Sequence, residues 1–400
     1  GLLHDRQGRV IDECLGVVCR APHSYTGEET VELQCHGSPA MLAAGLEALL
    51  AAGARQAGPG EFTRRAFLNG KLDLTQAEAV VDLIDAETAD AAANAAGQLG
   101  GALKRAIGPV YDGLTDLCSH FHAVLDYPDE DIEDFGAAEL SGALDRAGAA
   151  LQELLATYEK GRHLRQGVRA VLLGKPNAGK SSLLNRLAGY DRVIVTDIAG
   201  TTRDTVEEPV RVGRVLLRLT DTAGIREAGD AIEALGVARS EQAAREAELA
   251  LFVCDASQPL TDEDRRAIEA AKCAPRSLAL CNKSDLPAAV SPDELPFDTV
   301  LTVSARTGAG LDALPALLEG WFLGENACDG SLLTNPRQFG ALDRASRAIE
   351  RAKTGLSLGV TPDAVLTDVE EAMAALGEVT GRTVREDITN RIFERFCVGK

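Results

Sequence analysis

The pattern of apolar and polar residues divides the chain into stretches of different character. Residues 1–60 combine short β-type runs, "CLGVVCRAP" and "ETVELQCHG", with one helical run, "PAMLAAGLEALLAAG". This mixture predicts a small α+β unit. From about residue 72 to 165 the chain is rich in alanine, and in 73–92 apolar residues recur every three or four positions. That spacing predicts helices that bury one face.

The pattern changes near residue 168. Between 168 and 323 short apolar runs alternate with helical segments, which is typical of a mainly parallel sheet covered by helices. From 335 to 400 the pattern is helical again, and Thr361-Pro362 is a suitable cap and first turn. The stripe that we expect in the core of this last part is Leu366, Val369, Met373 and Leu376. The acidic run at 126–136 predicts a solvated loop between long helices.

We therefore predict a multidomain fold, α/β plus α. A small α+β N-terminal domain spans 1–70, and a helical bundle domain is formed by two chain segments, 71–166 and 325–400. An α/β domain at 167–324 is inserted between these two segments. The chain starts without a methionine, so we expect a fragment whose N-terminal domain is truncated at its start.

Composition narrows the classes of function. The formal charge of −20 argues against broad non-specific nucleic-acid binding, which needs a basic surface, although a local RNA contact stays open. The nine cysteines form no C-x-x-C pair and indicate reduced thiols in a cytoplasmic protein. No run of about 18 apolar residues is present, so we expect no membrane span.

The segment "GKPNAGKSS" fits the phosphate-binding pattern G-x-x-x-x-G-K-[ST]. It follows the apolar run "AVLL" and precedes a helical run, which is the strand–loop–helix setting that the pattern needs. Loop N–H groups would hold phosphates, Lys180 would reach the β- and γ-phosphates, and Ser181 would bind Mg²⁺. The predicted contacts of this loop are Asn177, Ala178, Gly179, Lys180, Ser181 and Ser182.

Four further motifs follow in order, each near the end of a predicted strand. They are "GTTRD" with a Mg²⁺-binding Thr202, "DTAG" (Asp221, Thr222, Ala223, Gly224), "NKSD" (Asn282, Lys283, Asp285) and "SAR" (Ser304, Ala305, Arg306). Asp285 can accept hydrogen bonds from N1–H and the 2-amino group of guanine, a donor pair that adenine lacks. The set predicts a Ras-like P-loop GTPase domain that binds GTP and GDP.

The predicted hydrolytic machinery differs from that of a common GTPase. Ile225 stands where a glutamine would position the attacking water, so another group must act. Glu233 is our candidate, although a solvated helix carboxylate is the simpler interpretation. Asn177 could help to bind K⁺, which would supply positive charge at the transition state.

These residues together resemble the MnmE (TrmE) family of tRNA-modifying GTPases. The likeness rests on residues 60–88, on "GKPNAGKSSLLN", "VTDIAGTTRDTVEE" and "DTAGIREAGDAIEALG", and on the terminal "FCVGK". It covers essentially the whole chain. The glycine-rich strand segment that opens the family's sequences is absent here.

The resemblance implies several properties that the motifs alone do not give. Glu32, Lys71 and Lys400 match positions that bind a 5-formyl-tetrahydrofolate as one-carbon donor. Asn177, Thr196, Ile198 and Thr201 would hold K⁺, and Glu233 matches a catalytic glutamate. The family forms homodimers, with K⁺-dependent pairing of the G domains. It works with the FAD-dependent protein MnmG, in a heterotetramer or larger complex, on carbon 5 of the wobble uridine of tRNA.

The C-terminal "CVGK" allows other interpretations. A prenylation box fits poorly, because Gly399 and Lys400 stand where an aliphatic residue and a different last residue are usual. A frayed tail is the simplest alternative. Cys397 is a candidate for a chemical role, against plain packing or redox sensitivity.

Two other functions compete with the modification enzyme. A ribosome-assembly or RNA-associated switch GTPase would share the G motifs, but would be expected to carry a basic RNA-binding module, which we do not find. A folate-binding scaffold with a degenerate G domain is disfavoured, because Lys180, Ser181, Asp221 and Asp285 are all present.

Overall fold

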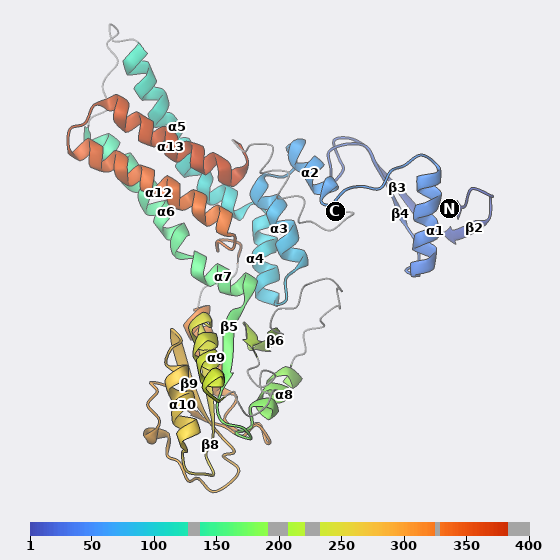
Figure 1. Ribbon diagram of the computed structural model, residues 1–400. Coiled ribbons are helices and arrows are strands. Elements are labelled where there is room, and N and C mark those ends of the chain that lie inside the picture. Colours follow the sequence, from blue (N-terminus) through green and yellow to red (C-terminus); the bar gives the residue numbers. More distant parts are fainter. Residues whose placement is uncertain (127–136, 191–206, 221–232, 325–328, 383–400) are drawn as a thin grey trace.

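The computed structural model describes residues 1–126, 137–190, 207–220, 233–324 and 329–382 (Figure 1). Its N-terminal region contains two small antiparallel sheets and one helix. These elements are β1 (Leu2–His4), β2 (Val10–Glu13), β3 (Leu15–Cys19), β4 (Thr30–Gln34) and α1 (Pro39–Ala51). Leu15 is 68% and Val31 67% exposed. The β3–β4 pair is therefore uncovered within the described part of the chain.

The helical part is assembled from two distant chain segments, as predicted. The first supplies α2 (Glu61–Leu68), α3 (Leu74–Ile84), α4 (Ala89–Leu99), α5 (Ala102–Asp126), α6 (Ala137–Ala156) and α7 (Tyr158–Gln166); the second supplies α12 (Pro336–Ser357) and α13 (Pro362–Thr380). Helices α5, α6, α12 and α13 share one apolar core (Figure 1). The predicted stripe lies in it, with Leu366, Val369 and Leu376 buried and Met373 packed against them.

The helical stretch at residues 73–92 is divided into two helices, although its apolar residues recur without a gap. Helix α3 starts at a capping box, in which the Asp73 side chain accepts from the Gln76 amide while the Gln76 side chain accepts from the Asp73 amide. It ends at Ile84, and Thr88 then caps α4 by accepting from the Ala91 amide at 3.1 Å. Residues 73–92 are therefore parts of two helices.

The described residues of the α/β block, within 168–324, form one sheet of six strands in the order β10-β9-β8-β5-β7-β6. The strands are β5 (Val168–Leu173), β6 (Glu207–Val212), β7 (Val215–Thr220), β8 (Leu249–Asp255), β9 (Arg276–Asn282) and β10 (Val300–Thr302). The helices are α8 (Lys180–Tyr190), α9 (Glu233–Glu246), α10 (Asp262–Ala271) and α11 (Ala313–Phe322). All neighbouring pairs are parallel except β6–β7.

The strand order locates the ligand-binding edge of this sheet. The chain runs from β5 toward β7 on one side and from β8 toward β9 and β10 on the other. The order therefore reverses between β5 and β8, and ligands of such sheets bind beyond the carboxyl ends of the strands at this point.

The centre of the sheet is buried on both faces. All seven residues of β8 are buried, with Leu251 and Val253 in one core cluster and Phe252 and Cys254 in another. A continuous apolar run is the expected form of a strand covered on both sides. Among the described helices, none is both long and apolar enough to cross a membrane.

Candidate nucleotide site

The phosphate-binding pattern forms a tight loop between β5 and α8. Gly174 and Gly179 have φ values of 143° and 100°. A Cβ atom added to Gly174 would lie 2.1 Å from the backbone carbonyl oxygen of Val253. One added to Gly179 would lie 2.2 Å from the side-chain nitrogen Nδ2 of Asn282. Only glycine fits at either position. Lys180 Nζ donates to the carbonyls of Gly174 at 2.7 Å and Lys175 at 2.9 Å, so its ammonium group spans the loop.

A buried ion pair anchors this loop to α10. Lys175 Nζ lies 2.9 Å from Asp264 Oδ2, and Asp264 is fully buried. The same oxygen accepts from the amide and the hydroxyl of Thr261 at 2.9 and 2.8 Å. Sequence reasoning missed this pair, because the partners lie 89 residues apart and no local signal joins them.

One side chain joins three of the predicted motifs. Asn282 Nδ2 donates to the Ala178 carbonyl at 2.9 Å, and Asn282 Oδ1 accepts from the Ala305 amide at 2.9 Å. Asn282 is 2% exposed. The phosphate loop, "NKSD" and "SAR" are therefore held in one arrangement by a single buried carboxamide.

The carboxylate assigned to guanine lies beside this junction. Asp285 Oδ1 accepts from Ser304 Oγ at 2.6 Å, and Asp285 Oδ2 lies 2.6 Å from Arg306 Nη2. The hydrogen bond from Ser304, aided by the charge of Arg306, lowers the pKa of Asp285 from its ordinary value. Asp285 is therefore ionised at neutral pH and can accept the two donors of a guanine edge.

A second carboxylate at the same edge was not identified from the sequence. Asp255 ends β8, is 3% exposed, and accepts from Lys283 Nζ at 2.6 Å. Burial opposes its ionisation, but hydrogen bonds from Lys283 and Ser257 outweigh burial and lower the pKa of Asp255. The pair holds Lys283, whose φ is 65°, in the "NKSD" turn. An acidic residue directly after the run "LFVC" is the signal that could have revealed it.

The remaining predicted nucleotide residues divide into described and undescribed groups. Asn177 is exposed in a left-handed conformation with φ 61°, and Ser181 and Ser182 are exposed in the first turn of α8. Glu233 begins α9, but its side chain lies outside the description. Outside the described residues lie Thr196, Ile198, Thr201, Thr202, Asp221, Thr222, Ala223 and Gly224, and also Cys397 and Lys400.

The structure does not bring the two described folate candidates into contact. Lys71 Nζ donates to the Pro22 carbonyl at 3.0 Å, in the connection between β3 and β4. Glu32 is exposed on β4, opposite Val17 of β3. No hydrogen bond or ion pair joins Glu32 to Lys71 among the described residues, so their shared role stays a prediction.

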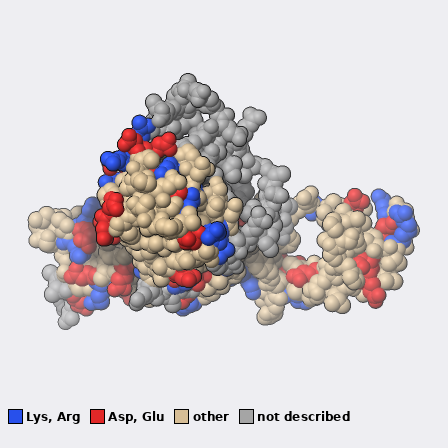
Figure 2. All heavy atoms as spheres, turned by 90° about the horizontal axis from the view of Figure 1, so that it is seen from below, with Lys and Arg blue, Asp and Glu red and all other residues tan. Residues whose placement is uncertain are grey.

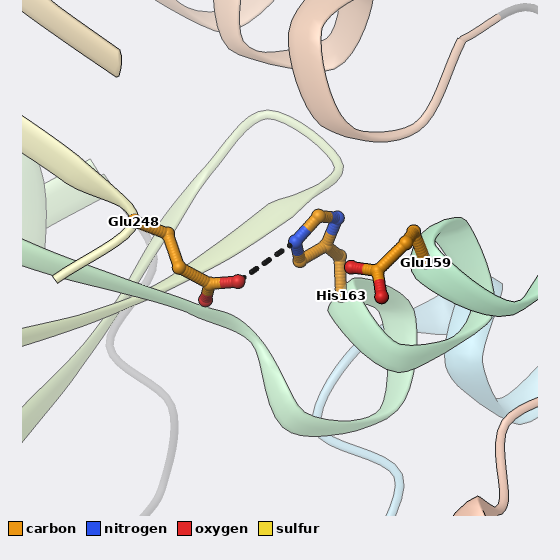
Figure 3. Close-up of side chains that lie close together, drawn as sticks. All are labelled: Glu159, His163 and Glu248. Carbon is orange, nitrogen blue, oxygen red and sulfur yellow. Dashed lines mark hydrogen bonds and ion pairs between the residues drawn. The ribbon is translucent and has the colours of Figure 1, made fainter. Parts of the chain in front are cut away.

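A cluster of possible metal ligands lies at the amino end of β8, away from the predicted nucleotide site. The guanidinium group of Arg162 already pairs with its carboxylates. The ligand atoms of Glu159, His163 and Glu248 lie within 4.8 Å of one another, with His163 Nε2 3.1 Å from Glu248 Oε1 (Figure 3). The Arg162 guanidinium pairs with both carboxylates, at 2.7 Å from Glu159. We therefore interpret the cluster as a charged joint between α7 and β8.

The surface gives no strong sign of a nucleic-acid groove on the face shown in Figure 2. Among the described side chains on that face, Lys and Arg are interspersed with Asp and Glu around a broad uncharged area. Many arginines elsewhere in the described part are paired with carboxylates, as Arg218 is with Glu87 at 2.5 Å. This distribution agrees with the net charge of −20.

Two family models match this chain. The MnmE helical domain model matches residues 74–397, and the model of the GTP-binding protein TrmE N-terminus matches residues 1–71. Among solved structures, the G domain of the FeoB iron transporter of T. maritima is 22% identical, with a TM-score of 0.28, over 37% of this chain and 94% of that one.

Full-length relatives are much more similar. The tRNA modification GTPase MnmE of Roseiflexus sp. (strain RS-1) is 46% identical over 416 residues, covering 100% of this chain and 89% of the relative. The protein of the same name from Aquifex aeolicus (strain VF5) is 42% identical over 404 residues, with the same coverage. This chain belongs to the MnmE family of tRNA modification GTPases.

Proposed function

We propose that this chain is the K⁺-dependent, GTP-hydrolysing component of a complex that modifies carbon 5 of the wobble uridine in tRNA. The observation that carries the proposal is that Asn282 joins three GTPase motifs beside Asp285, which presents an ionised carboxylate. Family membership supports tRNA as the substrate.

The residues present fit a guanosine nucleotide. The glycines let the loop pack closely against Val253 and Asn282, the Lys180 ammonium group supplies positive charge, and Ser181 would offer a hydroxyl for Mg²⁺. Asn177 would share K⁺ with Thr196, Ile198 and Thr201, and Thr202 would complete the Mg²⁺ ligands. When bound, the two cations offset charge that develops on the transferring phosphoryl group. Glu233 would orient the attacking water in place of the missing glutamine.

The wider chemistry of the proposal follows the family. Glu32, Lys71 and Lys400 would bind a formyl-tetrahydrofolate that supplies the one-carbon unit, with Cys397 nearby in sequence. The chain would act in the cytoplasm as a homodimer, together with the FAD-dependent partner MnmG. The chemistry of the described residues allows these contacts, since Lys71 is exposed and carries a cation suited to an anionic cofactor.

Nucleoside mass spectrometry of tRNA tests the substrate directly. In cells that lack the gene, we expect the 5-aminomethyl-type groups on wobble uridine to disappear, and the restored full-length gene to bring them back. If these groups persist in the deletion strain, the chain is not required for the modification. An assembly-switch GTPase would then be the better description.

Steady-state hydrolysis tests the role of Glu233. We expect Glu233→Ala to keep GTP binding and to lose about 100-fold or more in kcat, the range of a positioned general base. Glu241→Ala, on the same helix, is the matched control, since the Glu241 carboxylate pairs with Arg245 on the surface. Unchanged turnover in Glu233→Ala would remove this residue from the mechanism.

A further inference from the structure

The carboxylate assigned to guanine, Asp285, has a partner within the protein on each of its two oxygens. Ser304 Oγ donates to Asp285 Oδ1, and the Arg306 guanidinium lies 2.6 Å from Asp285 Oδ2. Ser304 is fully buried and its Oγ also accepts from the Thr307 amide at 3.1 Å. This partner is therefore fixed in place. Arg306 differs, because its side chain is 75% exposed while Asp285 is 13% exposed.

The group on Oδ2 resembles the ligand. A guanidinium ion presents parallel N–H donors in a plane, which suit a carboxylate. The N1–H and 2-amino donors of guanine form the same kind of planar edge. A guanine edge that engages both carboxylate oxygens needs Oδ2, where Arg306 Nη2 already lies 2.6 Å away, so the base and Arg306 approach the same oxygen.

We propose that Arg306 competes with guanine for Asp285, so that it lowers the affinity for GTP and GDP and must release Oδ2 before the base binds. The inference rests on the proposed base contact at Asp285. Arg306 is suited to this role, since its exposed side chain can move into water without disturbing the fold.

Binding kinetics of a fluorescent GDP analogue to the full chain test this inference. We expect Arg306→Ala to bind about two- to fivefold more tightly, the range for loss of one exposed ion pair, and chiefly through faster association. Raising the ionic strength with choline chloride, at constant K⁺, should shrink the difference because salt screens an exposed pair. Arg351→Ala is the control, since Arg351 pairs with Asp368 and Glu371 in the helical part.

A double-mutant cycle separates this competition from other roles of Arg306. In an Asp285→Asn background the carboxylate is gone, so we expect Arg306→Ala to change GDP affinity no further. If Arg306→Ala weakens binding or leaves it unchanged while Asp285→Asn still abolishes guanine selectivity, the competition is wrong and the base site stands. If Asp285→Asn keeps its guanine selectivity, the proposed base contact itself is wrong.

Discussion

The two ends of strand β8 carry charged clusters of opposite character. Glu248 directly precedes the strand and is enclosed by Arg162 and His163 of α7, with its side chain 15% exposed. At the carboxyl end, Asp255, Asn282 and Asp285 surround the predicted base site. The first cluster satisfies its charges internally, whereas the second has a carboxylate whose cationic partner lies largely in water.

This difference shows why similar residue types serve different purposes. A half-buried carboxylate that contacts an arginine and a histidine of a neighbouring helix holds two parts of the chain together. A carboxylate at the carboxyl end of a parallel sheet, held by a buried serine and an exposed arginine, keeps an acceptor available for a ligand. The spacing of the first cluster alone would suggest a metal site. The pairing of Arg162 with Glu248 argues against a metal there.

A substitution in the core of β8, the strand that joins the two clusters, should have the largest effect on stability. Phe252 is fully buried in β8 and stacks on Phe297 with ring centroids 5.5 Å apart. We expect Phe252→Ala to destabilise the α/β block by about 3–5 kcal/mol, the usual loss for a buried aromatic ring, and to weaken GTP binding as well. Hydrogen exchange of the β5 and β8 amides measures the loss.

Val31→Ala serves as the control for that variant. Val31 lies on β4 and is 67% exposed, so its truncation should cost less than about 0.5 kcal/mol. Equal losses for the two variants would mean that burial does not distinguish these strands in solution.

Removing the carboxylate at the amino end should affect stability but not the nucleotide. We expect Glu248→Ala to cost about 2–3 kcal/mol of unfolding free energy, because Arg162 and His163 lose their shared, half-buried partner. GTP affinity should stay within about twofold, since the base site lies at the other end of the strand. Denaturant titration and nucleotide binding on the same preparation check both parts.

The pH dependence of stability sharpens this prediction. Burial opposes ionisation of Glu248, but hydrogen bonds from His163 and Arg162 outweigh burial and lower its pKa from 4.5 to about 2. The folded state therefore binds the proton more weakly than the unfolded chain. The contribution of Glu248 is complete above pH 4.5 and is lost as the pH falls toward 2. Glu248→Ala should lose stability less steeply across this window than the unaltered protein.

Replacing Asp285, at the carboxyl end of the sheet, should affect GTP binding strongly and stability weakly, the reverse of Glu248→Ala. We expect Asp285→Asn to lose about 2 kcal/mol of GTP binding free energy, roughly 30-fold in affinity, because hydrogen bonds to a charged acceptor are lost. Its unfolding free energy should fall far less than that of Glu248→Ala, because asparagine can still accept the hydrogen bond from Ser304. Competition binding with GTP and ATP provides the measurement, and an unchanged preference for GTP would contradict the assigned base contact.

The smallest effect should come from the exposed member of the Glu248 cluster. Glu159 is 67% exposed and contacts Arg162 three residues along the same helix. We expect Glu159→Gln to cost less than about 0.5 kcal/mol by thermal unfolding, as surface pairs usually do. A loss as large as that of Glu248→Ala would show that all three charges act as one unit.

Much of the α/β block could be predicted because its signals are local. Each motif follows an apolar run, and the expected strands at "AVLL", "VLLRLT" and "SLALC" lie within β5, β7 and β9. The break between α3 and α4 was missed, since apolar residues keep recurring through residues 85–88, whereas α3 ends at Ile84 and Thr88 caps the start of α4. Strands β1 and β2 were also missed, because three or four residues carry too little pattern.

The sequence by itself determined the kind of chemistry, because phosphate loops and base-binding motifs are short and depend on residue type and order. Tertiary structure decided which side chains meet. Asn282 reaches a carbonyl 104 residues away, Lys175 reaches a buried carboxylate 89 residues away, and Arg306 pairs with Asp285, the carboxylate that we predict to bind guanine. Such contacts follow from the order of strands in the sheet and the directions of the loops between them. Local pattern does not encode those properties, because they arise when distant segments pack together.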